Sequence, residues 1–234
     1  DTPTMVFSAT NAVKSQIIKS EKDSGLDHVW AHMDADRFRR QVSVLYDIFR
    51  FKRLGVVYED SPIVRDYSAI TDIKEVASKK GFELIEYHVK NPVDQSDTKR
   101  YYKDLAKAYK NISKEIDGMY ITVAYIEPSK LSNLLEPFYE KDIPVFSQLG
   151  DQEVKYGAFM SISLTDYENI GKFGAKQIGK VLNGSKPREL KQVFKSTPKI
   201  VLNIEVADKI RYRTPFEFLL IADKIYNKIK NSGD

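Results

Sequence analysis

The sequence lacks cysteine and contains no long apolar run. Without cysteine the chain forms no disulfide, binds no metal through thiolates and carries no thiol nucleophile. The longest unbroken apolar run extends over five residues, from Phe218 to Ala222, far short of the roughly 20 residues that span a bilayer as a helix. A packed core must therefore stabilise the fold, and 234 residues suffice to form one.

Charge is abundant but is not concentrated in one sign. The chain has 37 Lys and Arg against 33 Asp and Glu, a net charge of +4, and 42% of its residues are hydrophobic. Basic and acidic residues interleave, as in Lys103, Asp104 and Lys107, whereas a nucleic-acid-binding surface gathers basic residues on one face. We therefore expect one large domain or two lobes that bind no nucleic acid.

Short apolar runs of strand character alternate with segments of helical periodicity along most of the chain. Between Tyr101 and Ile112, for example, the apolar residues recur at the spacing of one helix face. Such alternation predicts an α/β fold with a mostly parallel sheet and helices on both faces. The predicted strands are Met5–Phe7, Val29–Trp30, Leu54–Tyr58, Phe82–Tyr87, Met119–Val123, Ile143–Phe146, Ala158–Ile162 and Ile200–Asn203.

Several helix boundaries are also predicted by local signals. Ser61 and Pro62 suit the start of a helix that Gly81 would end. The capping-box spacing recurs at Thr165–Glu168 and at Thr214–Glu217, and the second predicts a final helix that ends near Ile229.

No catalytic, metal or cofactor motif is present. The chain has no glycine-rich dinucleotide fingerprint, no P-loop and no G-x-S-x-G nucleophile elbow. His28 and His32 lie four residues apart and are followed by Asp34 and Asp36, which makes them candidate metal ligands. The spacing fixes no third ligand, however. We therefore assign no catalytic residue, no metal and no cofactor, and we do not expect an enzyme.

Polar and aromatic side chains follow several predicted strands. The segments concerned are Ser8–Asn11, Tyr58–Ser61, Thr122–Tyr125 and Ser147–Gly150. Ligands of open α/β sheets bind beyond the carboxyl ends of parallel strands. Hydroxyls, amides and aromatic rings at these ends suit a small polar ligand, although loops after strands are polar in any α/β domain.

The order and spacing of segments between about residues 53 and 210 resemble those of a known family. The segments are Leu54–Tyr58, Lys80–Glu83, Asp117–Ile121, Lys141–Phe146, Tyr156–Ala158, Asp166–Gly171, Leu182–Pro187, Leu202–Asn203 and Ala207. Together they resemble the ABC-transporter substrate-binding proteins of the type I periplasmic-binding-protein fold, in the group that includes tryptophan- and tyrosine-binding members.

The resemblance implies two α/β lobes joined by a hinge, with a solute trapped between them and delivered to an ABC permease. It implies a periplasmic or other extracytoplasmic location, with a lipid anchor on the full-length product as a further expectation. The first lobe would comprise residues 1–33 and 162–198, and the second residues 34–161 and 199–234. Because family members begin with about three βα units, we expect the first lobe to be incomplete at the N-terminus. Its exposed sheet edges would favour a homodimer.

Eight residues are candidate ligand contacts. Six lie at or after the ends of predicted strands, and two begin a predicted helix as hinge-side contacts: Thr10, Asn11, Tyr58, Asp60, Tyr125, Gln148, Asp166 and Tyr167. Members of the family that bind amino acids commonly carry an acidic residue where this chain has Ala124, so the ligand class stays open. Two alternatives also stay open, a ligand-sensing extracytoplasmic domain of a signalling system and an enzyme on a doubly wound α/β scaffold.

Overall fold

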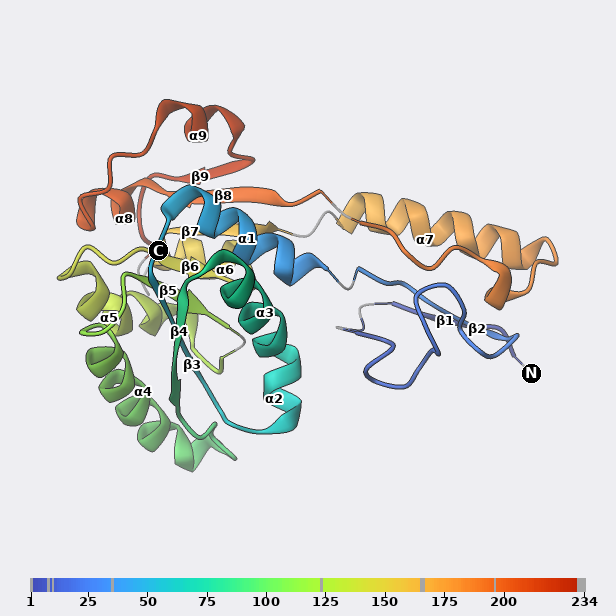
Figure 1. The fold of residues 1–234 in the computed structure, drawn as a ribbon, viewed down its shortest axis with the longest axis horizontal. Helices are drawn as coiled ribbons and strands as arrows, with labels where there is room; N and C mark the ends of the chain where they lie inside the picture. Colours follow the sequence, from blue (N-terminus) through green and yellow to red (C-terminus); the bar gives the residue numbers. More distant parts are fainter. Residues whose placement is uncertain are drawn as a thin grey trace. The chain divides into compact units, whose positions relative to one another are not determined.

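The computed structural model describes residues 2–7, 9, 11–34, 36–122, 124–164, 167–195 and 197–230, without the side chains of residues 163, 164 and 167. The chain forms two compact units (Figure 1). The smaller unit comprises residues 1–37 and 165–197, and the larger unit comprises residues 38–164 and 198–234. None of the helices described is both long and apolar enough to span a membrane.

The larger unit is built on a seven-stranded sheet with the order β4-β3-β5-β6-β7-β8-β9. The strands are β3 (Arg53–Tyr58), β4 (Glu83–His88), β5 (Gly118–Ile121), β6 (Val145–Ser147), β7 (Met160–Leu164), β8 (Lys199–Asn203) and β9 (Lys224–Tyr226). All neighbouring strands pair in parallel except β7 and β8, which are antiparallel. The predicted α/β class with a mostly parallel sheet is confirmed.

Helices cover both faces of this sheet. They are α1 (Arg37–Phe49), α2 (Pro62–Tyr67), α3 (Ile70–Lys80), α4 (Thr98–Ile112), α5 (Pro128–Tyr139), α6 (Asp151–Lys155), α8 (Ile204–Lys209) and α9 (Phe216–Ile221). Helices α4 and α5 lie on one face, and α2 and α3 lie on the other (Figure 1). This follows from right-handed crossovers, because the chain moves outward from β3 to β4 and then back past β3 to β5.

Large aromatic side chains fill the core of the larger unit. The rings of Phe146 on β6 and Phe49 on α1 have centroids 4.7 Å apart. Phe138 on α5 packs against Tyr109 on α4 from the other side of the sheet, with centroids 5.3 Å apart. Phe146, Phe138 and Phe159 are fully buried, and each such side chain contributes about 1.5–3 kcal/mol through removal of apolar surface from water. The central strands that lead to the site are thus fixed by packing on both faces.

The smaller unit has its own core. Strands β1 (Thr4–Val6) and β2 (Val29–Ala31) pair in parallel, and helix α7 extends from Tyr167 to Leu182. Trp30 is fully buried, packs near Phe7 and Phe173, and donates from its indole nitrogen to the Lys191 carbonyl at 3.0 Å.

Two sequence-based expectations about helices were wrong. The helix predicted between Ser61 and Gly81 is divided into α2 and α3, because Ala69 adopts a left-handed conformation with φ of 53°. The final helix predicted to end near Ile229 stops as α9 at Ile221. After α9 the chain returns to the sheet and pairs as β9 with β8. The Asp223 side chain holds this segment beside β8 by accepting a hydrogen bond from the Ile200 amide at 2.8 Å.

Candidate functional site

The carboxyl ends of β3, β5 and β6 meet at one edge of the larger sheet. These strands are neighbours, and they end at Tyr58, Ile121 and Ser147. The predicted site residues Tyr58, Asp60, Tyr125 and Gln148 lie in or directly after these ends. Parallel pairing therefore brings segments distant in the sequence to the edge at which open α/β sheets bind ligands.

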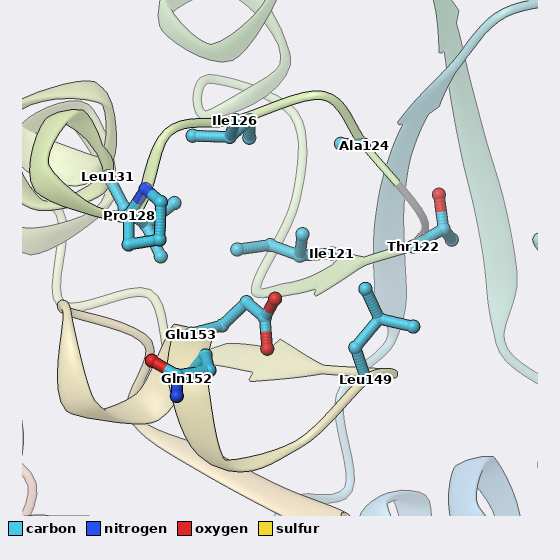
Figure 2. A pocket seen from close by; sticks show the side chains of 9 residues that line it. All are labelled: Ile121, Thr122, Ala124, Ile126, Pro128, Leu131, Leu149, Gln152 and Glu153. Carbon is cyan, nitrogen blue, oxygen red and sulfur yellow. The ribbon is translucent and has the colours of Figure 1, made fainter.

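A pocket lies at this edge between the chain that follows β5 and the first turn of α6 (Figure 2). Its volume is about 20 Å³, room for about one water molecule. The lining combines six apolar residues with three polar ones: Ile121, Ala124, Ile126, Pro128, Leu131, Leu149, Thr122, Gln152 and Glu153. Figure 2 shows the Glu153 carboxylate pointing away from α6 and toward Ile121.

Ser147 organises the turn that positions Glu153. Its hydroxyl accepts hydrogen bonds from the backbone amides of Leu149 at 3.1 Å and Gly150 at 3.0 Å, and donates to Glu153 Oε2 at 3.1 Å. Burial raises the pKa of the Glu153 carboxyl, and the negative charge of Asp151 adds to this, while the hydrogen bond from Ser147 acts in the opposite direction.

Three buried polar atoms at this edge have no hydrogen-bond partner among the described residues: Ser68 Oγ, Thr122 Oγ1 and Gln148 Oε1. Hydrogen bonds of Gln148 link the three segments that carry these atoms. The Gln148 amide donates to the Ile121 carbonyl at 2.9 Å, and Gln148 Nε2 donates to the Tyr67 carbonyl at 3.2 Å. Buried polar atoms usually find a partner, so these atoms offer unused hydrogen-bonding capacity beside the pocket.

Tyr58 makes contacts within the sheet and is not an exposed ligand contact. Its side chain is buried, its hydroxyl donates to Glu86 Oε2 at 2.6 Å, and its ring meets His88 edge-on at 4.8 Å. Burial and the neighbouring Glu86 carboxylate raise the pKa of Tyr58. The hydroxyl therefore joins β3 to β4.

Replacing Tyr58 with phenylalanine should lower the free energy of unfolding by about 1–3 kcal/mol, because a hydrogen bond to a charged acceptor is lost. The loss should fall short of the maximum, since Glu86 keeps its ion pair with Lys74 at 2.9 Å. Urea denaturation followed by circular dichroism measures the change. The exposed Tyr67 gives the matched control, and Tyr67→Phe should change stability by less than about 0.5 kcal/mol. Equal effects of the two variants would contradict this role of Tyr58.

The other predicted residues differ in accessibility. Asp60 accepts a hydrogen bond from Arg65 Nε at 2.6 Å and is exposed on the same edge. Tyr125 has 63% of its surface exposed, so its ring is free to stack on a solute. Gln148 is buried, with its amide group committed in part to the Tyr67 carbonyl.

The remaining predicted residues belong to the smaller unit. Asn11 caps a local turn there, since its Oδ1 accepts from the amides of Val13 at 3.1 Å and Lys14 at 3.0 Å. Thr10 and Asp166 lie outside the described residues, and Tyr167 is described only by its backbone, as the first residue of α7.

Three residues that the structure places at the site were not among the candidates. Thr122 and Ser147 belong to the strand ends that sequence reasoning identified, and a preference for hydroxyls there would have selected them. Glu153 had only one signal, its place in the first turn after a buried strand. Its surroundings depend on Ile126 and Leu131, which are distant in the sequence.

A mostly parallel sheet with a pocket at its carboxyl ends is the architecture of the open α/β ligand-binding folds. The comparisons identify the family: the chain belongs to the ABC transporter substrate-binding proteins, whose family description matches residues 1–226. The family predicted from the sequence is thus confirmed. Its members are substrate-binding proteins rather than enzymes, and are typically extracytoplasmic. No curated protein matches the chain.

Solved structures with the same fold are similar to this chain. One is the ABC domain in complex with L-Trp from Streptococcus pneumonia, at 20% identity over 95% of this chain and 71% of that chain, with a TM-score of 0.69. A conserved domain protein from Vibrio cholerae is 23% identical over 96% and 72%, with a TM-score of 0.71. The ligand-free, open structure of CD0873, a substrate-binding protein with adhesive properties from Clostridium difficile, is 20% identical over 97% and 72%, with a TM-score of 0.74.

Proposed function

We propose that this protein works outside the cytoplasmic membrane, where it binds a small polar or aromatic solute and delivers it to an ABC permease. The solute would bind at the carboxyl ends of β3, β5 and β6. The observation that carries the proposal is the pocket at this edge, with unpartnered buried oxygens of Thr122 and Gln148 beside it among the described residues. In a family of substrate-binding proteins, such unused hydrogen-bonding capacity fits a solute contact better than a catalytic group.

The composition of the edge supports a solute with both a polar and an apolar part. Leu149 lines the pocket and is 50% exposed, and Tyr125 follows β5 with its ring accessible. Aromatic rings pack favourably on flat ligands. The L-Trp in the structure from Streptococcus pneumonia makes aromatic amino acids reasonable first candidates.

The proposal is tested by thermal unfolding of the chain against a panel of solutes. The panel contains amino acids including L-tryptophan, nucleosides, sugars and small organic acids. A solute at about 100 times its dissociation constant stabilises the folded protein by about 2.7 kcal/mol, which raises the melting temperature by several degrees. We expect a shift with one chemical class. The absence of a shift with every class at millimolar concentration would overturn the proposal.

Replacing Tyr125 with alanine should weaken binding of the stabilising solute about 2- to 12-fold, because a stacking contact is worth about 0.5–1.5 kcal/mol. The exposure of the ring predicts little change in unfolding. Isothermal titration calorimetry measures the affinity, and Tyr125→Phe serves as the control that keeps the ring. If Tyr125→Ala bound the solute as tightly as the original protein, the ring would have no part in recognition.

A further inference from the structure

Glu153 places one carboxylate in a pocket whose other walls are mostly apolar. Ile121, Ile126 and Leu131 surround the same space, and the carboxylate points into it (Figure 2). Among the described residues, the hydrogen bond that this carboxylate accepts comes from a neutral donor, the Ser147 hydroxyl at 3.1 Å. A carboxylate removed from water is costly unless a cation or several hydrogen bonds compensate it.

The two other acidic residues that flank the pocket are compensated. Glu127, directly before α5, forms an ion pair with Lys130 at 2.9 Å. Asp151, two residues before Glu153 on α6, forms an ion pair with Lys224 at 3.0 Å and also accepts a hydrogen bond from the Tyr226 hydroxyl at 2.7 Å. Across the described residues, no Lys, Arg or His forms an ion pair with Glu153, so its compensating charge is available for a ligand to supply.

The dimensions of the pocket indicate which part of a ligand would enter. Its volume of about 20 Å³ admits a group about the size of a water molecule, and an ammonium group has that size. Thr122 belongs to the same lining, and its hydroxyl is buried and without a partner in the described chain, but it points away from the Glu153 carboxylate (Figure 2). At the rim, Leu149 is half exposed and able to cover an apolar body.

We propose that Glu153 binds the ammonium group of the solute, so that the solute belongs to the class of small organic amines with an apolar body. The inference rests on the proposed function, because it names the chemical class for that same site. The amine would exchange water for a charge-assisted hydrogen bond to the carboxylate, with its apolar body against Leu149. Neutral or anionic analogues would leave the carboxylate uncompensated.

The test compares amines with alcohols of the same carbon skeleton by isothermal titration calorimetry near neutral pH. The pairs are tryptamine and tryptophol, tyramine and tyrosol, and isoamylamine and isoamyl alcohol. A hydrogen bond to a charged group is worth about 1.5–3 kcal/mol, so at least one amine should bind about 10- to 100-fold more tightly than its alcohol. This comparison needs no variant. If every alcohol bound as tightly as its amine, the inference would be wrong.

The variant Glu153→Gln then assigns the preference to this residue. Glutamine keeps an oxygen that can accept from Ser147, so the turn should stay intact, and thermal unfolding checks this. The preference for the amine should vanish in Glu153→Gln and persist in the control Glu140→Gln, which removes an exposed carboxyl at the opposite end of α5. An amine preference that survives in Glu153→Gln would overturn the assignment.

The inference and the proposed function fail in different ways. If the broad panel reveals a neutral or anionic solute while no amine binds, the solute-binding function stands and the role of Glu153 is refuted. If no compound of either panel binds, the proposed function is refuted and the inference falls with it.

Discussion

Replacing Phe146 with alanine will lower the free energy of unfolding of the larger unit by about 3–5 kcal/mol. The ring is fully buried on β6, in the middle of the sheet, where it meets Phe49 at 4.7 Å and Phe51 at 6.2 Å between ring centroids. The neighbouring rings are themselves held by other contacts, so they can close the resulting cavity only in part. Urea denaturation followed by circular dichroism measures the loss.

Phe216 offers the same substitution at the surface of the same unit. Its side chain is 68% exposed on α9, so Phe216→Ala should change stability by less than about 0.5 kcal/mol. A loss at Phe146 no larger than the loss at Phe216 would show that β6 does not lie in the centre of the core.

Replacing Gly157 with alanine will destabilise the larger unit by about 2–5 kcal/mol, because the site combines backbone strain with a steric clash. Gly157 has φ of +131°, and a Cβ would lie 2.6 Å from the Tyr139 hydroxyl and 3.1 Å from the Ser132 Cα. Neither neighbour can retreat freely, since the Tyr139 hydroxyl donates to the Gly157 carbonyl at 2.6 Å and Ser132 presents backbone of α5. Thermal and urea unfolding report the loss.

Gly81 is a control that has the backbone strain of Gly157 but not its steric clash. It ends α3 with φ of +80°, but a Cβ added there would meet open space, with no described atom within 4 Å. Gly81→Ala should therefore cost only about 1 kcal/mol, from strain alone. Losses of equal size at the two glycines would mean that the turn after α6 relaxes around the added methyl group.

Gly157 also bears on the site, because its turn closes the helix that carries Glu153. The Ala158 amide donates to the Glu153 carbonyl at 2.7 Å, directly after the glycine. A clash with Tyr139 would be transmitted to α6 over a few residues. We therefore expect Gly157→Ala to weaken solute binding as well as stability.

Local sequence patterns predicted most of the sheet but not its last strand. The strands β3, β5 and β8 are apolar runs bounded by polar residues, and the parallel order of β3 and β5 follows from the helices between them. The three residues of β9 carry no strand pattern of their own, because their pairing depends on β8 and on the Asp223 side chain. The break between α2 and α3 at Ala69 was likewise not predictable, because the helical periodicity of the sequence continues on both sides of it.

The same distinction applies to the candidate site. Strand ends are polar in the sequence, so the edge at Tyr58, Tyr125 and Gln148 was predictable from the rule for open sheets. Whether a hydroxyl at this edge faces a solute or a neighbouring strand depends on tertiary contacts, as the hydrogen bond from Tyr58 to Glu86 illustrates. The surroundings of Glu153 were unpredictable for the same reason, because its apolar neighbours come from the chain after β5.

The central claim, that the solute binds at the carboxyl ends of β3, β5 and β6, is tested most directly by backbone amide chemical shifts. The stabilising solute is titrated into isotope-labelled protein, and shifts are mapped on the larger unit. The account predicts changes concentrated at Thr122, Gln148 and Glu153, with little change at the opposite edge, around Arg53 and Gly118. Changes concentrated at that opposite edge, with none at the carboxyl ends, would contradict it.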